Sequence, residues 1–138
     1  MNPYLNFPSG TTRKAFDLYQ RVLGAKLLFT HTWGESPENA QAPGMKPDDV
    51  MHATLQFPDG AILMGADCPP EYLKPLGGFS LSVNAENVAD AERFFAGLSE
   101  NGTVTMPLEE TFWAQRFGMC VDQFGVPWMV NCEMKAPE

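Results

Sequence analysis

The chain has 138 residues, of which 44% are hydrophobic and 12% aromatic. That length and composition suit one folded domain with a single hydrophobic core and exclude wholesale disorder. The 17 acidic and 9 basic residues leave a formal net charge of −8, which repels phosphate backbones, so no nucleic acid partner is expected. No apolar run approaches the roughly 20 residues of a membrane span, so no membrane association is expected.

The cysteines and the N-terminal segment indicate in which cellular compartment the protein is expected. "MNPYLNFPSG" lacks the basic and apolar regions of a secretory signal. Cys68, Cys120 and Cys132 form no CxxC pair, and any disulfide scheme would leave one thiol over. These features predict a reducing, cytoplasmic setting.

The first predicted elements are a strand and an amphipathic helix. "NPYLNF" (residues 2–7) alternates polar and apolar residues, as a half-buried strand does. "RKAFDLYQRVLG" (13–24) has apolar residues at helical spacing, with Thr11 or Thr12 as N-cap and Gly24 as the C-terminal stop. The apolar face of this helix consists of Ala15, Leu18, Tyr19 and Val22.

Three strands are expected after this helix. They are "AKLLFTHTWG" (25–34), "VMHATLQF" (50–57) and "AILMGAD" (61–67), and the last two are joined by "PDG", a hairpin signal. The polar loop of residues 36–49 between the first two contains three prolines. A loop of that length is either a lid over a site or a simple insertion.

The same order of elements then repeats. "GFSLSV" (78–83) predicts a strand, and "VADAERFFAGLSENG" (88–102) predicts a helix. Three further strands follow: "GTVTMPL" (102–108), "AQRFGMCV" (114–121) and "VPWMVNC" (126–132). We therefore predict an α+β fold of two βαβββ modules, residues 1–68 and 78–138, joined by a proline-rich linker at 69–77 within one compact domain.

This arrangement resembles the vicinal oxygen chelate superfamily, which includes glyoxalase I, bleomycin-resistance proteins and extradiol dioxygenases. The match is closer to its PhnB-like branch, also labelled 3-demethylubiquinone methyltransferase-like. The resemblance implies that the modules form a cup-shaped incomplete barrel and that the protein is a homodimer. The residues that carry it are "PYLNF", "FTHTWGESP", "VMHATLQFPDGAILMGAD" and "FWAQRFGMCVDQFGVPWMVN".

The resemblance also implies a divalent metal, held by His and Glu from the first and last strands of each module, that stabilises an enolate-like anion. The corresponding positions of this chain carry no His, Asp or Glu. We therefore predict that the usual metal site is absent and that no cofactor is tightly bound, although a divalent metal at another site stays open. One such alternative site would use His52, Asp67, Cys68 and Cys132. The family positions are Asn2, Tyr4, Asn6, Leu63, Met64, Gly65, Gly78, Ser80, Ser82, Met129, Val130 and Asn131.

Other residues could still carry chemistry. His52 is either a general base or anion donor facing the cup, or a histidine hydrogen-bonded within the sheet. Trp113 and Arg116, in "EETFWAQRFGM", suit an apolar wall and a bidentate anion clamp. Alternatively, Trp113 is a core or dimer contact and Arg116 balances an acidic neighbour. His31 is expected at an exposed or dimer-facing position.

We predict a PhnB-like protein that binds a small, partly apolar metabolite, which can be anionic, without the usual metal ligands. The expected lining residues are Tyr4, His52, Trp113, Arg116 and Asn131, and His52 is the candidate catalytic residue. One alternative is a metal-dependent lyase, isomerase or dioxygenase, and another is a non-catalytic assembly protein. The chain has no GxSxG, P-loop or GxGxxG motif, so hydrolase, NTPase and Rossmann functions lack motif support.

Overall fold

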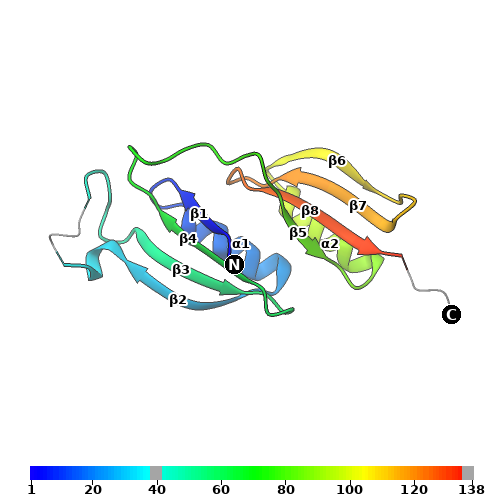
Figure 1. The fold of residues 1–138 in the computed structure, drawn as a ribbon, viewed down its shortest axis with the longest axis horizontal. Coiled ribbons are helices and arrows are strands. Elements are labelled where there is room, and N and C mark those ends of the chain that lie inside the picture. Colours follow the sequence, from blue (N-terminus) through cyan, green and yellow to red (C-terminus); the bar gives the residue numbers. More distant parts are fainter. Residues whose placement is uncertain (38–41, 135–138) are drawn as a thin grey trace. The chain divides into compact units, whose positions relative to one another are not determined.

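The structure, a computed structural model, describes residues 1–37 and 42–134. The chain divides into two compact units, Met1–Lys74 and Pro75–Glu138. Each unit contains one helix and one four-stranded sheet (Figure 1).

In the first unit, strand β1 (Tyr4–Phe7) leads to helix α1 (Thr12–Leu23), and β2 (Lys26–Thr32) is followed by the short 3₁₀ helix η1 (Trp33–Glu35). The strands β3 (Val50–Gln56) and β4 (Ile62–Asp67) complete the sheet, whose order is β1-β4-β3-β2. The strand β1 pairs with β4 in parallel, and the other neighbours are antiparallel. The predicted hairpin is confirmed, since Gly60 has φ +91° in the turn between β3 and β4.

The second unit repeats this plan. The strand β5 (Leu81–Asn84), helix α2 (Val88–Ser99) and strands β6 (Thr103–Glu109), β7 (Ala114–Val121) and β8 (Pro127–Glu133) form a sheet of order β5-β8-β7-β6. The predicted α+β fold of two βαβββ modules is therefore confirmed. The strands β1 and β5 begin later than expected, at Tyr4 and Leu81 instead of Asn2 and Gly78. In β1 the preceding residue, Pro3, contributes only its carbonyl, which accepts from Met64 N at 3.1 Å.

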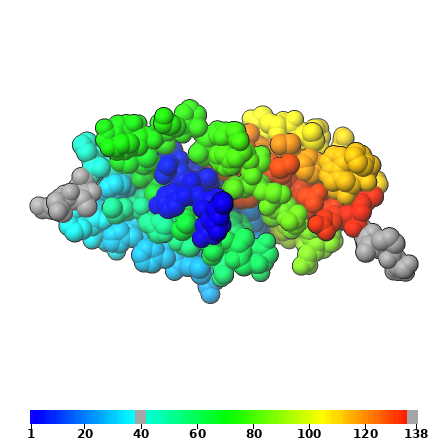
Figure 2. All heavy atoms as spheres, viewed as in Figure 1, coloured from blue at the N-terminus to red at the C-terminus, as the bar shows by residue number. Residues whose placement is uncertain are grey.

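Each sheet has two chemically different faces, because side chains alternate along a strand. The face toward the helix is apolar and buried: Leu5 and Phe7 of β1 are 3% and 0% exposed. We call the opposite face the free face of that sheet, and it is visible in front of the helix in Figure 1. Figure 2 shows the N-terminal residues at the surface of their unit. The free face of the first sheet carries Tyr4, Phe29, His31, His52, Thr54 and Met64, and that of the second carries Ser82, Asn84, Phe117, Met119, Met129 and Asn131.

The ends of helix α1 are stabilised by different means. Gly24 ends the helix in the left-handed conformation, at φ +72°, as the sequence predicts. Thr11 precedes the helix but makes no side-chain cap. Instead, the Oδ1 of Asp67, at the end of β4, accepts from Thr11 N at 3.2 Å, Thr12 N at 3.0 Å and Thr12 Oγ1 at 2.8 Å. A carboxylate from a distant strand therefore replaces the expected local cap.

The loop of residues 36–49 includes positions 38–41, which lie outside the described residues, so the lid expectation stays a prediction. The C-terminal end of this loop is held by hydrogen bonds to other segments of the first unit. Asp49 is buried and accepts from Ser9 Oγ at 2.6 Å, and its carbonyl accepts from Trp33 N at 2.9 Å. In the described parts of the chain, neither helix is long and apolar enough to cross a bilayer.

Candidate functional site

A three-residue polar network lies on the free face of the first sheet. Tyr4 Oη is 3.0 Å from His52 Nδ1, and His52 Nε2 is 3.0 Å from Thr54 Oγ1. The ring of Phe29 is 6.0 Å from the imidazole between centroids. The network therefore combines a phenol, an imidazole and a hydroxyl beside an apolar wall, which is a common composition of small-molecule sites.

Strand register brings these residues together although Tyr4 and His52 are 48 positions apart. Tyr4 pairs with Met64 of β4, and Met64 pairs with Thr54 of β3. His52 precedes Thr54 by two residues, so it lies on the same face and diagonally across β4 from Tyr4. The parallel placement of β1 beside β4 is thus what assembles the site.

Burial raises the pKa of Tyr4 above its usual value near 10. The phenol therefore stays protonated at physiological pH and can donate a hydrogen bond. A neutral imidazole has one N–H and one accepting nitrogen. If Nδ1 of His52 carries the proton, it donates to Tyr4 Oη, and Thr54 donates to Nε2. In that tautomer the phenolic hydrogen of Tyr4 is available to an oxygen of a ligand.

The free face of the second sheet has a neutral polar pair and an aromatic ladder. Asn131 Nδ2 donates to Asn84 Oδ1 at 3.3 Å. Phe117 of β7 pairs with Asn131 of β8 and lies 5.5 Å from the ring of Trp113 between centroids. The ladder continues to Phe112, 4.8 Å from Trp113, at the β6–β7 turn.

Arg116 points away from this face. It pairs with Cys132, which is 1% exposed on the helix side of the sheet. Arg116 Nε lies 3.9 Å from Glu92 Oε1 on α2, and its Nη1 donates to the carbonyl of Gln115 at 2.6 Å. The alternative from the sequence, in which Arg116 balances an acidic neighbour, is therefore the arrangement found.

The five predicted lining residues thus fall into three groups. Tyr4 and His52 are in direct contact within the first unit. Trp113 and Asn131 share the second unit and are connected by Phe117. Within the second unit, Arg116 lies on the helix side of the sheet, opposite Phe117 and Asn131.

The residues at the family metal positions do not fit a divalent ion. On the free faces those positions offer Tyr4 paired with Met64, Ser82 paired with Met129, and the amides of Asn6 and Asn131. Neutral hydroxyls, amides and thioethers are weak ligands for divalent ions, which are normally held by carboxylate or imidazole donors. Within residues 1–37 and 42–134 there is no group of three or more His, Cys, Asp or Glu that could hold a metal.

The alternative metal site built on His52 and Asp67 is wrong. Ala53 of β3 pairs with Gly65 of β4, so His52 lies on the free face and Asp67 on the helix side. Asp67 is 1% exposed, and its Oδ2 accepts from Val50 N at 2.8 Å while its Oδ1 caps α1. Its carboxylate is therefore fully used by the fold.

Two residues of the site, Thr54 of the network and Phe29 beside it, escaped sequence reasoning. Thr54 follows His52 by two positions and so had to share its face, a signal that strand periodicity alone provides. Phe29 is brought beside His52 by the pairing of β2 with β3, across a bulge between Leu27 and Phe29. A bulge shifts the register by one residue and leaves no clear mark in sequence.

The fold and these positions can be compared with known proteins. A family model described as the Glyoxalase/Bleomycin resistance protein/Dioxygenase superfamily matches residues 3–130. The chain belongs to this superfamily. The protein YjdN of Escherichia coli K12 is 38% identical over 145 residues, which cover 99% of this chain and 97% of YjdN.

Solved structures extend the comparison within the superfamily. The crystal structure of protein PA1353 from Pseudomonas aeruginosa has 44% identity and a TM-score of 0.87 over 98% of both chains. A PhnB protein from Bacillus cereus, assigned provisionally by name as a 3-demethylubiquinone-9 3-methyltransferase, has 25% identity and a TM-score of 0.80 over 96% of this chain and 98% of its own. The predicted resemblance to the PhnB-like branch is therefore confirmed.

Proposed function

We propose that this superfamily member binds a small, partly apolar metabolite through an oxygen atom on the free face of its first sheet, without a tightly held metal. The observation that supports it is the contact of Tyr4 Oη with His52 Nδ1 at 3.0 Å beside Phe29. A neutral, partly exposed phenol and an imidazole supply hydrogen bonds to oxygen, and the phenyl ring supplies apolar contact.

The charges of the site restrict the ligand. Arg116 faces α2 and pairs with Glu92, and the protein carries a net charge of −8. Next to the Tyr4–His52 contact, the groups that can become cationic are His31 and His52, and Lys26 lies on the same face at the start of β2, where it pairs with Gln56. The ligand that fits is therefore a carbonyl compound or a monoanion, held by neutral donors, and not a multiply charged phosphate ester.

His52 is proposed as the residue that would act as a general base if the site is catalytic. Both of its ring nitrogens are already hydrogen-bonded to hydroxyl groups, those of Tyr4 and Thr54. As a base, His52 would be in its other neutral tautomer, in which Nε2 donates to Thr54 Oγ1 and Tyr4 Oη donates to Nδ1. Tyr4 Oη would then pass its proton to Nδ1 and take one from the ligand. Trp113 and Asn131 remain proposed lining residues of the second unit.

The two alternative functions have weaker support. A metal-dependent lyase, isomerase or dioxygenase would need carboxylate or imidazole ligands at positions that carry Tyr4, Met64, Ser82 and Met129. A protein used only for assembly would not need the hydrogen-bonded contact between Tyr4 and His52. Homodimer formation and a cytoplasmic location stay predictions.

The test is a titration of ¹⁵N-labelled protein with phenylpyruvate, benzoate and hydrocinnamate, followed by NMR. Chemical shifts are expected to change in β1, β3 and the β2 residues around Phe29. Tyr4→Phe removes one hydrogen bond, worth about 1 kcal/mol, so affinity should fall about 5-fold. Tyr72→Phe is the matched control, because Tyr72 is 67% exposed outside the network. Equal affinity of Tyr4→Phe and the wild type, or no response to any of the three probes, would contradict the proposal.

A further inference from the structure

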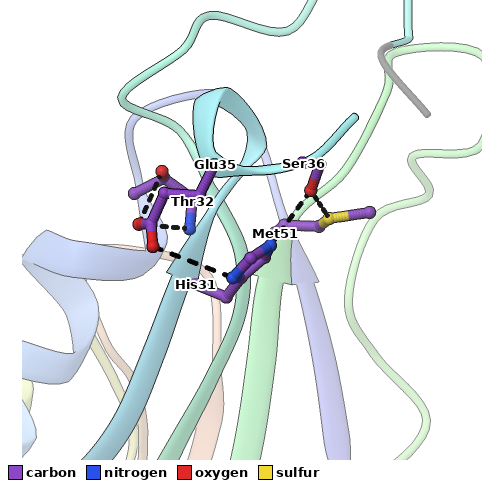
Figure 3. Close-up of polar contacts among 5 residues, drawn as sticks. All are labelled: His31, Thr32, Glu35, Ser36 and Met51. Atoms are coloured by element: carbon purple, nitrogen blue, oxygen red, sulfur yellow. Dashed lines mark hydrogen bonds and ion pairs between the residues drawn. The ribbon is translucent and has the colours of Figure 1, made fainter. Parts of the chain in front are cut away.

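A second polar cluster lies where β2 ends, and it has the connectivity of a serine–histidine–acid triad (Figure 3). Ser36 Oγ is 3.1 Å from His31 Nε2. On the other side of the imidazole, His31 Nδ1 is 3.9 Å from Glu35 Oε2. In triad enzymes the serine hydroxyl is hydrogen-bonded to one nitrogen of the histidine ring, and the carboxylate faces the other nitrogen. The same order is found here.

Local backbone structure holds these three side chains together. Thr32 and Glu35 form a capping box around η1, since Glu35 Oε1 accepts from Thr32 N at 3.2 Å and Thr32 Oγ1 at 2.8 Å. Gly34 N donates to Pro47 O at 2.9 Å, which joins the turn to the loop before β3. The carboxylate beside His31 is thus fixed by its own turn.

The Ser36 hydroxyl has one hydrogen, and the imidazole of His31 and the sulfur of Met51 are acceptors for it among the residues that the structure describes. Met51 Sδ lies 2.8 Å from Ser36 Oγ, and Figure 3 shows this contact beside the one to His31. A thioether is a weak acceptor and a neutral imidazole nitrogen a strong one. When His31 is neutral with its proton on Nδ1, toward Glu35, Ser36 therefore donates to Nε2. When His31 is protonated on both nitrogens, Nε2 donates to Ser36, whose hydrogen turns to Met51.

We propose that Ser36 is a nucleophile toward activated acyl and phosphonyl groups, with His31 as its general base and Glu35 as a positioning residue. In the step, Ser36 Oγ forms a bond to the carbonyl carbon or phosphorus while the Oγ–H proton moves to His31 Nε2. The bond to the leaving group then breaks, and the same proton passes from Nε2 to the departing oxygen or fluoride. The products are an acyl- or phosphonyl-serine and the protonated leaving group, so no further co-reactant is needed.

The surroundings of His31 indicate which electrophile fits. The ring of Phe29 is stacked nearly parallel to that of His31, with 6.5 Å between centroids and an interplanar angle of 3°. The side chain of His31 is 35% exposed, so a reagent can reach it. The titratable groups facing His31 are Glu35 and the cross-strand partner His52. An apolar or aromatic acyl group without charge is therefore favoured.

The reaction is expected to stop at the covalent product. An oxyanion hole needs free N–H donors, and removal of one such donor typically costs 10²–10³ in rate. Among the described residues, the nearby N–H groups of the turn all have hydrogen-bond acceptors already, and residue 37 is a proline without an N–H. These N–H groups are those of Thr32, Trp33, Gly34, Glu35 and Ser36. Stoichiometric modification, without efficient ester turnover, is thus the predicted behaviour.

The experiment is to incubate the full chain with a biotinylated fluorophosphonate and to locate the adduct by peptide mass spectrometry. One adduct per chain at Ser36 is expected, Ser36→Ala should abolish it, and Ser82→Ala is the matched control on the other unit. The labelling rate should rise with pH in the wild type. His31→Asn should label at least 10-fold more slowly and lose that pH dependence.

No adduct, an adduct at another residue, or an unchanged rate in His31→Asn would overturn the proposal. Thermal melting shows whether His31→Asn keeps its fold. If His31→Asn does not fold, Glu35→Gln, a substitution at an exposed position, is tested instead. A slower labelling rate in Glu35→Gln supports the proposal, and an unchanged labelling rate and pH profile overturns it. The result is independent of the metabolite site, because Tyr4→Phe should label as the wild type does.

Discussion

Asn131 of β8 donates from its Nδ2 to the Oδ1 of Asn84 on β5, across 3.3 Å. In metal-binding members of the superfamily, the last strand of a module is expected to provide a carboxylate near this point. Here two neutral amides face each other and satisfy each other in part. The pair forms because β5 and β8 are parallel and in register at these two residues.

This pair leads to a prediction about metals. Purified untagged protein should contain well under one equivalent of Mn, Fe, Ni or Zn by elemental analysis, because the free-face positions lack anionic ligands. Addition of these ions should leave the melting temperature unchanged. Metal near one per chain, or strong stabilisation by one ion, would instead favour the metal-dependent alternative.

The capping role of Asp67 predicts a large effect of a nearly isosteric change. In Asp67→Asn one carboxylate oxygen becomes an NH₂ group, and either orientation directs it at a buried backbone N–H, that of Val50 or that of Thr12. An unsatisfied buried donor costs about 1–3 kcal/mol, so the free energy of unfolding should fall by about 2–4 kcal/mol in urea titrations. Asp48→Asn is the control, because Asp48 is exposed. Equal stability of the two variants would refute this role.

Close packing of α2 on its sheet predicts the effect of a methyl group at Gly118. A Cβ there would lie 2.8 Å from the Cα of Leu108 and 2.9 Å from the ring of Phe95. Overpacking typically costs about 1–3 kcal/mol, so Gly118→Ala should lower the melting temperature by several degrees. Gly77→Ala, with nothing within 4 Å of its Cβ, should change it little. A neutral Gly118→Ala would mean that both the β6 backbone at Leu108 and the Phe95 side chain of α2 can shift at little cost.

The raised pKa of the Cys120 thiol predicts that the stability of the fold changes at alkaline pH. Burial, aided by the nearby Asp122, raises the pKa of Cys120 from 9.0 to about 11. Between these values the unfolded thiol loses its proton while the folded one keeps it, so stability falls as pH rises. The contribution is about 2 kcal/mol. The stability difference between wild type and Cys120→Ala should shrink by that amount from pH 8 to pH 11, and a constant difference would argue against it.

The edge strands bear on the predicted homodimer. Leu28 on β2 and Met106 on β6 are 49% and 44% exposed, and both strands lie at the edge of their sheets. Exposed apolar edges are normally covered by a partner or blunted. Light scattering at micromolar concentration should therefore give about twice the chain mass of 15.3 kDa. A measured mass of one chain would contradict the predicted homodimer, and both exposed strand edges would then need another explanation.

The sequence by itself determined the order of elements. The alternation of polar and apolar residues, the helical spacing of Ala91 and Phe95, and Gly24 after the first helix are local signals. Their physical basis lies within a few residues, in side-chain direction and allowed backbone dihedrals, so both modules could be predicted from one chain. The same periodicity places His52 and Thr54 on one face of their strand, and the pairing of β3 with β4 decides which face that is.

Only the tertiary structure decided which distant residues meet. The Tyr4–His52 contact depends on β1 lying beside β4, and the cap of α1 depends on Asp67 from the same strand. Arg116 illustrates the limit: its residue type suits an anion site, but the register with Cys132 turns it toward Glu92. A shift of one residue reverses every side chain of a strand. Register is set by core packing and bulges across the whole sheet, and no single segment of the sequence contains that information.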